Sequence, residues 1–169
     1  MIDKTLFKTQ KFLTYDIVKT SSQIGNLGIY RVSNIKDLPA NNPIQLRNEI
    51  RDIVWEKADV YRLRNSVKFS DLDIVEICCR IPIDTTKKAI NGKYKMTRNF
   101  LAKFTVGLQL SLEEANNLFR LEGGKLNLTN AFDYIVYHAL RDHDDIHSFI
   151  QEVYDLLNIH LDRDSKFKG

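Results

Sequence analysis

The sequence predicts a mostly α-helical protein, with about six helices between residues 44 and 158. Three observations lead to this prediction. Apolar residues recur every three or four positions along most of this range, as in helices that bury one face. Ser, Thr, Asn or Asp stands where several of these helices would begin, and its side chain can accept a hydrogen bond from a free amide of the first turn. Short turns containing Gly or Pro separate the segments.

The bulk composition is that of a single-domain globular protein. The chain has 169 residues, of which 43% are hydrophobic and 28% charged, values close to the average for globular domains. Its apolar runs are far shorter than the ~20 residues that cross a bilayer, and residues 1–12 lack the apolar core of a signal peptide. Cys78 and Cys79 are adjacent and form no disulfide framework. We therefore expect a cytoplasmic protein with no membrane contact and no cofactor.

Charge is distributed unevenly along the chain. Residues 60–109 carry ten Lys or Arg against four Asp or Glu, whereas residues 110–169 carry six basic against eleven acidic side chains. A basic middle beside an acidic C-terminal part is the asymmetry expected when one face of a protein meets a polyanion. Ordinary solvated charge can produce the same pattern, so charge alone leaves both interpretations open.

The first 43 residues differ from the rest of the chain. Two segments, 11–19 and 27–32, are rich in β-branched and aromatic side chains and are separated by a polar stretch with a glycine. This pattern predicts either a small β-hairpin or a loose arm. The segment 37–43 contains two prolines and two asparagines, a chain-breaking signal. We therefore divide the chain into an N-terminal arm or hairpin (1–43), a helical domain (44–158) and a C-terminal tail (159–169).

Two helices are expected before Pro82. The first covers about residues 43–63, and its tryptophan, Trp55, should pack against a neighbouring element. Ser70 caps the second helix together with Asp73, because the hydroxyl can accept a hydrogen bond from the first turn. That helix ends before Pro82, since the residue preceding a proline is disfavoured in helical backbone.

A short helix follows, with Asp84 as its N-cap and Ile90 at its end. Gly92 should stop it, because glycine adopts the left-handed C-cap conformation without strain. Further helices are predicted from the cap residues Thr97, Ser111 with Glu114, Asn130, and Asp144 or Asp145.

These elements, in this order, resemble the helix-turn-helix domain of phage repressors, the XRE type. The matching parts are a Ser-capped helix (70–79), a tight turn (80–83), a recognition helix (84–90), an Asn-Gly-Lys-like corner (91–95), and the helix and Leu-Glu-Glu signal that follow (97–114). The later stretch is similar to a helical module that often ends bacterial macro-domain proteins. The resemblance covers roughly residues 65–158 and implies a repressor-like bundle with two extra C-terminal helices.

In such a domain, the short helix enters the ~12 Å major groove, and side chains that face away from the core contact base edges. At about 100° per residue, Ile83, Thr86 and Ile90 face inward. Lysine can reach guanine acceptors, aspartate can accept from a cytosine amino group, and asparagine can pair with adenine. The candidate base contacts on the outward side are Asp84, Thr85, Lys88 and Asn91.

Phosphate contacts are expected around the same helix, where they would fix its register on the duplex without reading sequence. The candidates are Lys87, Lys93, Tyr94, Lys95 and Arg98, with Tyr94 acting through its hydroxyl. These residues can also be explained without DNA. The lysines can form an ordinary solvated face, and the tyrosine ring can pack against the corner. Asp84 can likewise be a plain helix cap.

No catalytic pattern accompanies these features, and we expect no enzyme and no metal site. His143 and His147 have a metal-like spacing, but a helix is predicted to begin between them and no third ligand is near in sequence. The chain contains no phosphate-binding glycine loop and no serine-nucleophile motif.

Two functions remain open. The first is a DNA-binding regulator of transcription, acting on double-stranded DNA, in which case the family resemblance implies a homodimer. The second is a protein-interaction module of the same fold without specific DNA readout, such as an antitoxin or an inhibitor of a host defence complex. Arg80, Pro82 and Ile90 favour the second function, because the family usually has glycine, serine and a polar residue at these positions.

Overall fold

The range described by the computed structural model is residues 41–162. It contains seven helices and no strand: α2 (Pro43–Asn65), α3 (Asp71–Cys79), α4 (Ile83–Ile90), α5 (Arg98–Gly107), α6 (Leu112–Glu122), α7 (Ala131–Asp142) and α8 (Ile146–Leu157). The prediction of a mostly α-helical domain is confirmed for this range. The predicted N-terminal hairpin or arm lies outside the described residues.

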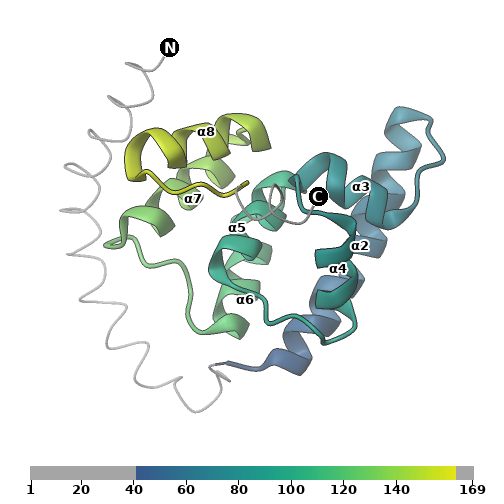
Figure 1. The fold of residues 1–169 in the computed structure, drawn as a ribbon, viewed down its shortest axis with the longest axis horizontal. Coiled ribbons are helices and arrows are strands. Elements are labelled where there is room, and N and C mark those ends of the chain that lie inside the picture. The colour runs from purple at the N-terminus through teal and green to yellow at the C-terminus, as the bar shows by residue number, and fades with distance from the viewer. Residues whose placement is uncertain (1–40, 163–169) are drawn as a thin grey trace.

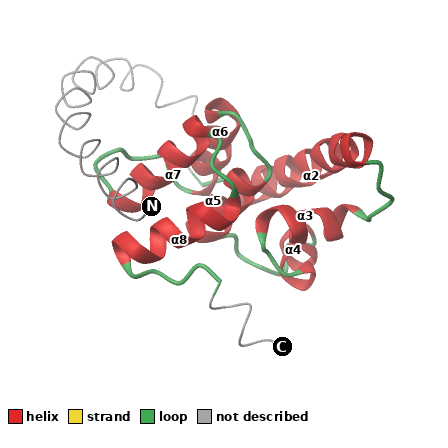
Figure 2. Cartoon of the chain, turned by 90° about the horizontal axis from the view of Figure 1, so that it is seen from above, coloured by secondary structure: helices red, strands yellow, loops and turns green. Residues whose placement is uncertain are grey.

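The helix α5 lies at the centre of the bundle (Figure 1), in contact with α3, α6, α7 and α8. On one side of it, α2, α3 and α4 pack against one another, and on the other side α7 packs against α8 (Figures 1 and 2). The principal contacts of α4 are with α2 and α3. This short helix therefore lies at the periphery of the fold.

The sequence of α5 explains its central position. Every residue from Phe100 to Val106 is buried, as expected for a helix that is apolar around most of its circumference. At its end, Gly107 allows α3 to approach closely, because a Cβ there would lie 2.5 Å from the carbonyl oxygen of Cys78 and 2.7 Å from Sγ of Cys79. The small residue thus sets the spacing of α3 and α5.

Most predicted helix starts are confirmed. The side chains of Ser70, Thr97, Ser111, Asn130 and Asp145 each accept a hydrogen bond from a backbone amide of the following turn. At Ser111 the Glu114 side chain completes a reciprocal capping box. These caps satisfy amides that have no partner within the helix.

The prediction that Asp84 caps α4 is wrong. The helix begins at Ile83, its N-cap is Pro82, and no side chain caps it. The proline ring fixes φ at −56° and so leads the chain directly into the helix. Asp84 therefore lies in the first turn, where its charge still suits the positive end of the helix dipole.

The prediction for Trp55 is also wrong, because its side chain is 70% exposed. The helix α2 buries a face made of Leu46, Ile50, Ile53, Val54 and Ala58. Trp55 follows Val54 by about 100° of helix rotation, which turns it away from that face. A large indole thus remains on the surface beside α4.

The chain after α8 packs against the bundle as far as the described residues reach. Leu161 is only 6% exposed and belongs to the hydrophobic core. Its carbonyl accepts a hydrogen bond from Nζ of Lys103, at 3.3 Å. The neighbouring Asp162 pairs with the same amine, also at 3.3 Å.

Candidate nucleic-acid interface

The turn between α3 and α4 positions the candidate interface. Its first residue, Arg80, has φ 56° and ψ 37°, the left-handed conformation that ends α3. The resemblance predicts a glycine at this place, and the structure shows a non-glycine residue in the conformation that glycine would adopt. A left-handed conformation costs a residue with a Cβ about 1–2 kcal/mol, so other contacts must hold Arg80 there.

Several contacts hold this turn. The backbone amide of Arg80 donates to the carbonyl of Glu76 at 2.9 Å, and its own carbonyl accepts from Nζ of Lys103 at 2.6 Å. Its guanidinium donates to Nδ1 of His147 at 3.0 Å and pairs with Asp162 at 3.0 Å. The turn is therefore tied to α5, α8 and the C-terminal segment.

Lys103 is the buried member of this network. Its side chain lies between the α3–α4 turn and Leu161, and the residue is 6% exposed. Burial lowers the pKa of its amine, and the nearby carboxylate of Asp162 opposes that shift. The amine thus joins the carbonyl at the end of α3 to a carbonyl of the C-terminal segment.

The buried face of α4 differs slightly from the predicted one, which was formed by Ile83, Thr86 and Ile90. Thr86 and Ala89 are fully buried, whereas Ile83 and Ile90 are only partly buried. The outer face is open to solvent. Of the four candidate base contacts, Asp84, Lys88 and Asn91 are exposed and Thr85 is half-buried, and the adjacent Lys87 is exposed as well.

Two of the candidate base contacts bind each other. Nζ of Lys88 lies 2.9 Å from Oδ2 of Asp84, one helical turn earlier. Their side chains are 46% and 64% exposed, and pairs of this kind contribute only about 0.3–0.5 kcal/mol. The pair is thus weak enough to open when a better partner, such as a base edge, is offered.

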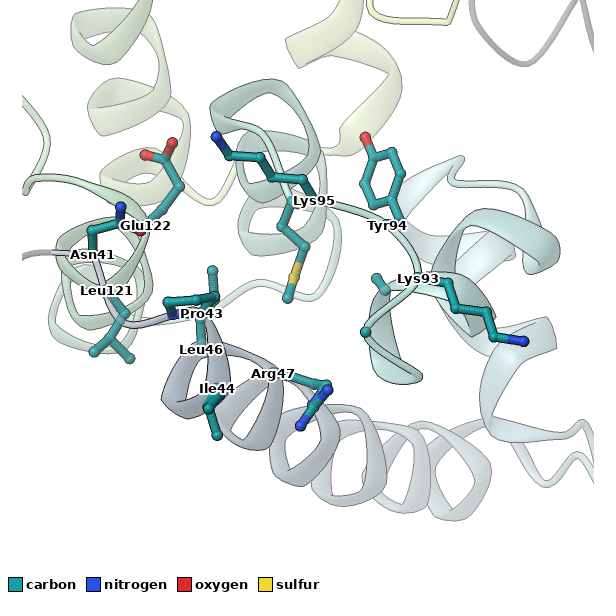
Figure 3. Close-up of a pocket in the computed structure, with 13 residues that line it drawn as sticks. Asn41, Pro43, Ile44, Leu46, Arg47, Lys93, Tyr94, Lys95, Leu121 and Glu122 are labelled. Carbon is teal, nitrogen blue, oxygen red and sulfur yellow. The ribbon is translucent and has the colours of Figure 1, made fainter.

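The corner after α4 presents two of the candidate phosphate contacts. Gly92 takes φ 76° and ends the helix as predicted, and Lys93 and Lys95 are exposed. Figure 3 shows their side chains pointing in opposite directions from the chain. Between them, the ring of Tyr94 is half-buried and lies 5.7 Å from that of Phe100. The tyrosine therefore supports the corner from inside.

Arg98 is engaged within the fold. Its guanidinium pairs with Asp133 at 2.7 Å and with Glu122 at 3.0 Å, and it donates to the carbonyl of Gly124 at 2.9 Å. It also lies over the ring of Phe119, 4.9 Å from the centroid. These contacts join α5 to α6 and α7. We therefore leave Arg98 out of the candidate interface.

Sequence reasoning missed two arginines that α2 brings to the same corner. Arg51 donates to the carbonyl of Ile90, at 3.2 Å, where a cation suits the negative end of the α4 dipole. Arg47, one turn earlier, lies against Gly92. Their spacing of four residues indicates that they share a face of α2. Only the packing of α2 on α4 shows that this face contacts the end of α4.

The structure also bears on a metal site between residues 41 and 162. No three His, Cys, Asp or Glu side chains in that range are placed to hold a metal ion. His147 bonds to Arg80, and His138 is buried against the rings of Tyr134 and Tyr137. Nor does any helix in the range combine the length and apolar character that crossing a bilayer requires.

Comparison of the chain with protein-family models, with curated proteins and with solved structures gives no match.

Proposed function

We propose that this protein binds double-stranded DNA through α4 and the following corner, as a helix-turn-helix regulator related to the phage repressors. The observation that carries the proposal is the open outer face of α4. Asp84, Lys87, Lys88 and Asn91 are exposed on a helix that is anchored by its opposite face. A helix with its side chains is about 10–12 Å across, which matches the ~12 Å width of the major groove.

The charge of this surface supports the proposal. From Ile83 to Lys95 the chain carries four lysines and a single acidic residue, Asp84. Lys93 and Lys95 lie beyond the end of α4, where they would reach the phosphates that border the groove. The Asp84–Lys88 pair would open on binding, so that each side chain contacts a base edge.

The test is binding of the full chain to fluorescent duplex DNA from a random-sequence pool, at several salt concentrations. About four to six phosphate contacts predict that the logarithm of the binding constant falls with the logarithm of salt concentration with a slope of roughly −3 to −5. Replacing Lys93 and Lys95 together by Gln should weaken binding to all sequences alike and flatten that slope. An absence of binding at low salt would contradict the proposal.

A second function is favoured by a different observation, the exposure of large apolar side chains on α2, on α3 and in the segment between them. Trp55 and Leu63 on α2 are 70% and 77% exposed, and Phe69 and Ile77 are about half exposed at 45% and 50%. Exposed tryptophans are typical energetic centres of protein–protein interfaces. The alternative is therefore a protein-interaction module that binds its partner through α2 and α3.

One pair of variants separates the two functions. Trp55→Gln should abolish capture of a protein partner and leave DNA binding almost unchanged if the two surfaces are independent. Lys88→Ala should leave capture of the protein partner unchanged and weaken binding to the preferred duplex, because Lys88 lies on α4 and is not one of these apolar side chains. Loss of DNA binding in both variants would indicate one continuous surface.

A further inference from the structure

A cavity of about 320 Å³ opens beside the α4 corner. It lies between the beginning of α2, the chain from Gly92 to Met96, and the end of α6 (Figure 3). Its apolar wall includes Leu46, Met96 and Leu121. The volume is at the lower end of the range for small-ligand pockets, which combine apolar walls with a few placed polar groups.

The polar group that most needs an explanation is Arg47. Its Nε is buried and has no hydrogen-bond partner, whereas buried polar atoms in proteins are almost always satisfied. The guanidinium lies against Gly92, where the Cβ of any other residue would collide with its Nη1. The absence of a side chain at Gly92 thus makes room for the charged end of Arg47 at this corner.

The charge around the cavity is unbalanced. Arg47, Lys93 and Lys95 all line it, and among the described residues none of the three has a carboxylate within ion-pair distance. Glu122 is the single acidic side chain among the described lining residues, and Arg98 already pairs with it at 3.0 Å. The lining therefore carries three cations, and among the described residues it supplies no free carboxylate.

We propose that this cavity binds a phosphate group, with Arg47 as its principal donor and with Lys93 and Lys95 adding positive charge at its rim. An arginine fork matches the oxygens of a phosphate in a bidentate manner. A monoester phosphate carries about −1.5 to −2 charges, which suits a site with several cations. A phosphodiester of the DNA backbone carries a single negative charge and would be held mainly by the fork. The phosphate has two possible sources, a free phosphate-bearing small molecule or the DNA backbone. Only the second source rests on the proposed function.

The first experiment tests the chemistry without DNA. The full chain, labelled with ¹⁵N, is titrated with inorganic phosphate at constant ionic strength, with chloride as the reference anion. Saturable shifts of the amides from Gly92 to Met96 are expected. Arg47→Gln should weaken binding about tenfold or more, because a charged hydrogen bond contributes about 1.5–3 kcal/mol. Arg64→Gln is the matched control, since Arg64 is exposed on the same helix, far from the cavity.

A second variant guards against a folding defect at the half-buried Arg47. Arg47→Lys retains the charge and loses the planar fork, so phosphate binding should weaken by several-fold while the helical circular dichroism stays that of the parent. If Arg47→Lys and Arg47→Gln both bind phosphate as the parent does, Arg47 is not the donor and the proposal is overturned.

The second experiment identifies the source. If the DNA backbone supplies the phosphate, Arg47→Gln reduces the magnitude of the salt slope by about 0.9, one contact's share. An unchanged slope together with Arg47-dependent phosphate binding supports a free small-molecule ligand. If the protein binds phosphate but no DNA, the phosphate site in the cavity is supported and the proposed DNA-binding function is contradicted. The cavity proposal is overturned if the amides do not respond to phosphate and Arg47→Gln leaves the DNA salt slope unchanged.

Discussion

The helices α4 and α5 follow each other in the chain and are similar in length, yet they are used in opposite ways. In α5, every residue from Phe100 to Val106 is buried. In α4, only Thr86 and Ala89 are buried, and four of the side chains from Asp84 to Asn91 are exposed and polar. The difference teaches that α5 carries the stability of this region, whereas α4 needs only enough burial to be held in place. Substitutions in the two helices should therefore affect different measurements.

The largest effect is expected in α5. Phe104 is completely buried, so Phe104→Ala should lower the free energy of unfolding by about 3–5 kcal/mol, through lost apolar burial and the cavity left behind. Lys87→Ala in α4 is the matched control and should change it by less than ~0.5 kcal/mol. Urea denaturation followed by circular dichroism measures both. Similar losses of unfolding free energy in the two variants would contradict the conclusion that α5 contributes more to stability than α4.

The next effect concerns the contact of α3 with α5. Burial raises the pKa of the Cys79 thiol well above its ordinary value of 9.0. Above that pH the unfolded chain releases a proton that the folded protein keeps, so stability falls as pH rises. Between the unfolded and the folded pKa of this thiol, the free energy of unfolding should fall as pH rises, with a slope that approaches about 1.4 kcal/mol per pH unit.

The variant Cys79→Ala isolates this contribution. Subtracting the free energy of unfolding of the variant from that of the parent at each pH cancels the contributions of the other groups that titrate at high pH. One of these is Lys103, whose lowered pKa makes stability change in the opposite direction. A parent and a variant with parallel stability curves from pH 8 to pH 11 would show that Cys79 ionises equally in both states. Solvent would then reach the Cys79 thiol in the folded protein, although the thiol donates to the carbonyl of Phe104 at 3.6 Å in the contact of α3 with α5.

A smaller effect is expected in α4 and in a different measurement. Lys88→Ala should reduce discrimination at one base pair by about 1–3 kcal/mol. Its effect on folding should be below ~0.5 kcal/mol, because only an exposed pair with Asp84 is lost. Competition between duplexes that differ at single positions measures the first, and thermal denaturation the second. A uniform loss across all sequences would reassign Lys88 to a phosphate contact.

The smallest effect is expected at Trp55, which lies beside α4 without being part of the core. Because its side chain is 70% exposed, Trp55→Gln should change the free energy of unfolding by less than ~0.5 kcal/mol. A loss above 1 kcal/mol in urea denaturation would show that the indole packs against part of the chain after all. Tyr134→Gln offers the contrast, since Tyr134 is fully buried and its substitution should be strongly destabilising.

The positions where most helices begin and end follow from local features of the sequence. Caps such as Ser111 with Glu114, and the stop at Gly92, act through hydrogen bonds and backbone angles within a few residues. Such local interactions are readable from spacing alone. The exposure of most residues on α4 also followed from periodicity, because a short helix that buries two small side chains must leave its polar side outward.

The tertiary structure alone decided which charges are free. Arg98 and Lys93 look alike in the sequence, yet Arg98 pairs with acids from α6 and α7 while Lys93 stays exposed. The placement of Arg47 against Gly92 likewise depends on α2 packing on the α4 corner, across more than 40 residues of chain. Ion pairs and cavities of this kind form between distant segments, and their partners are set by the packing of whole helices, which residue spacing does not encode.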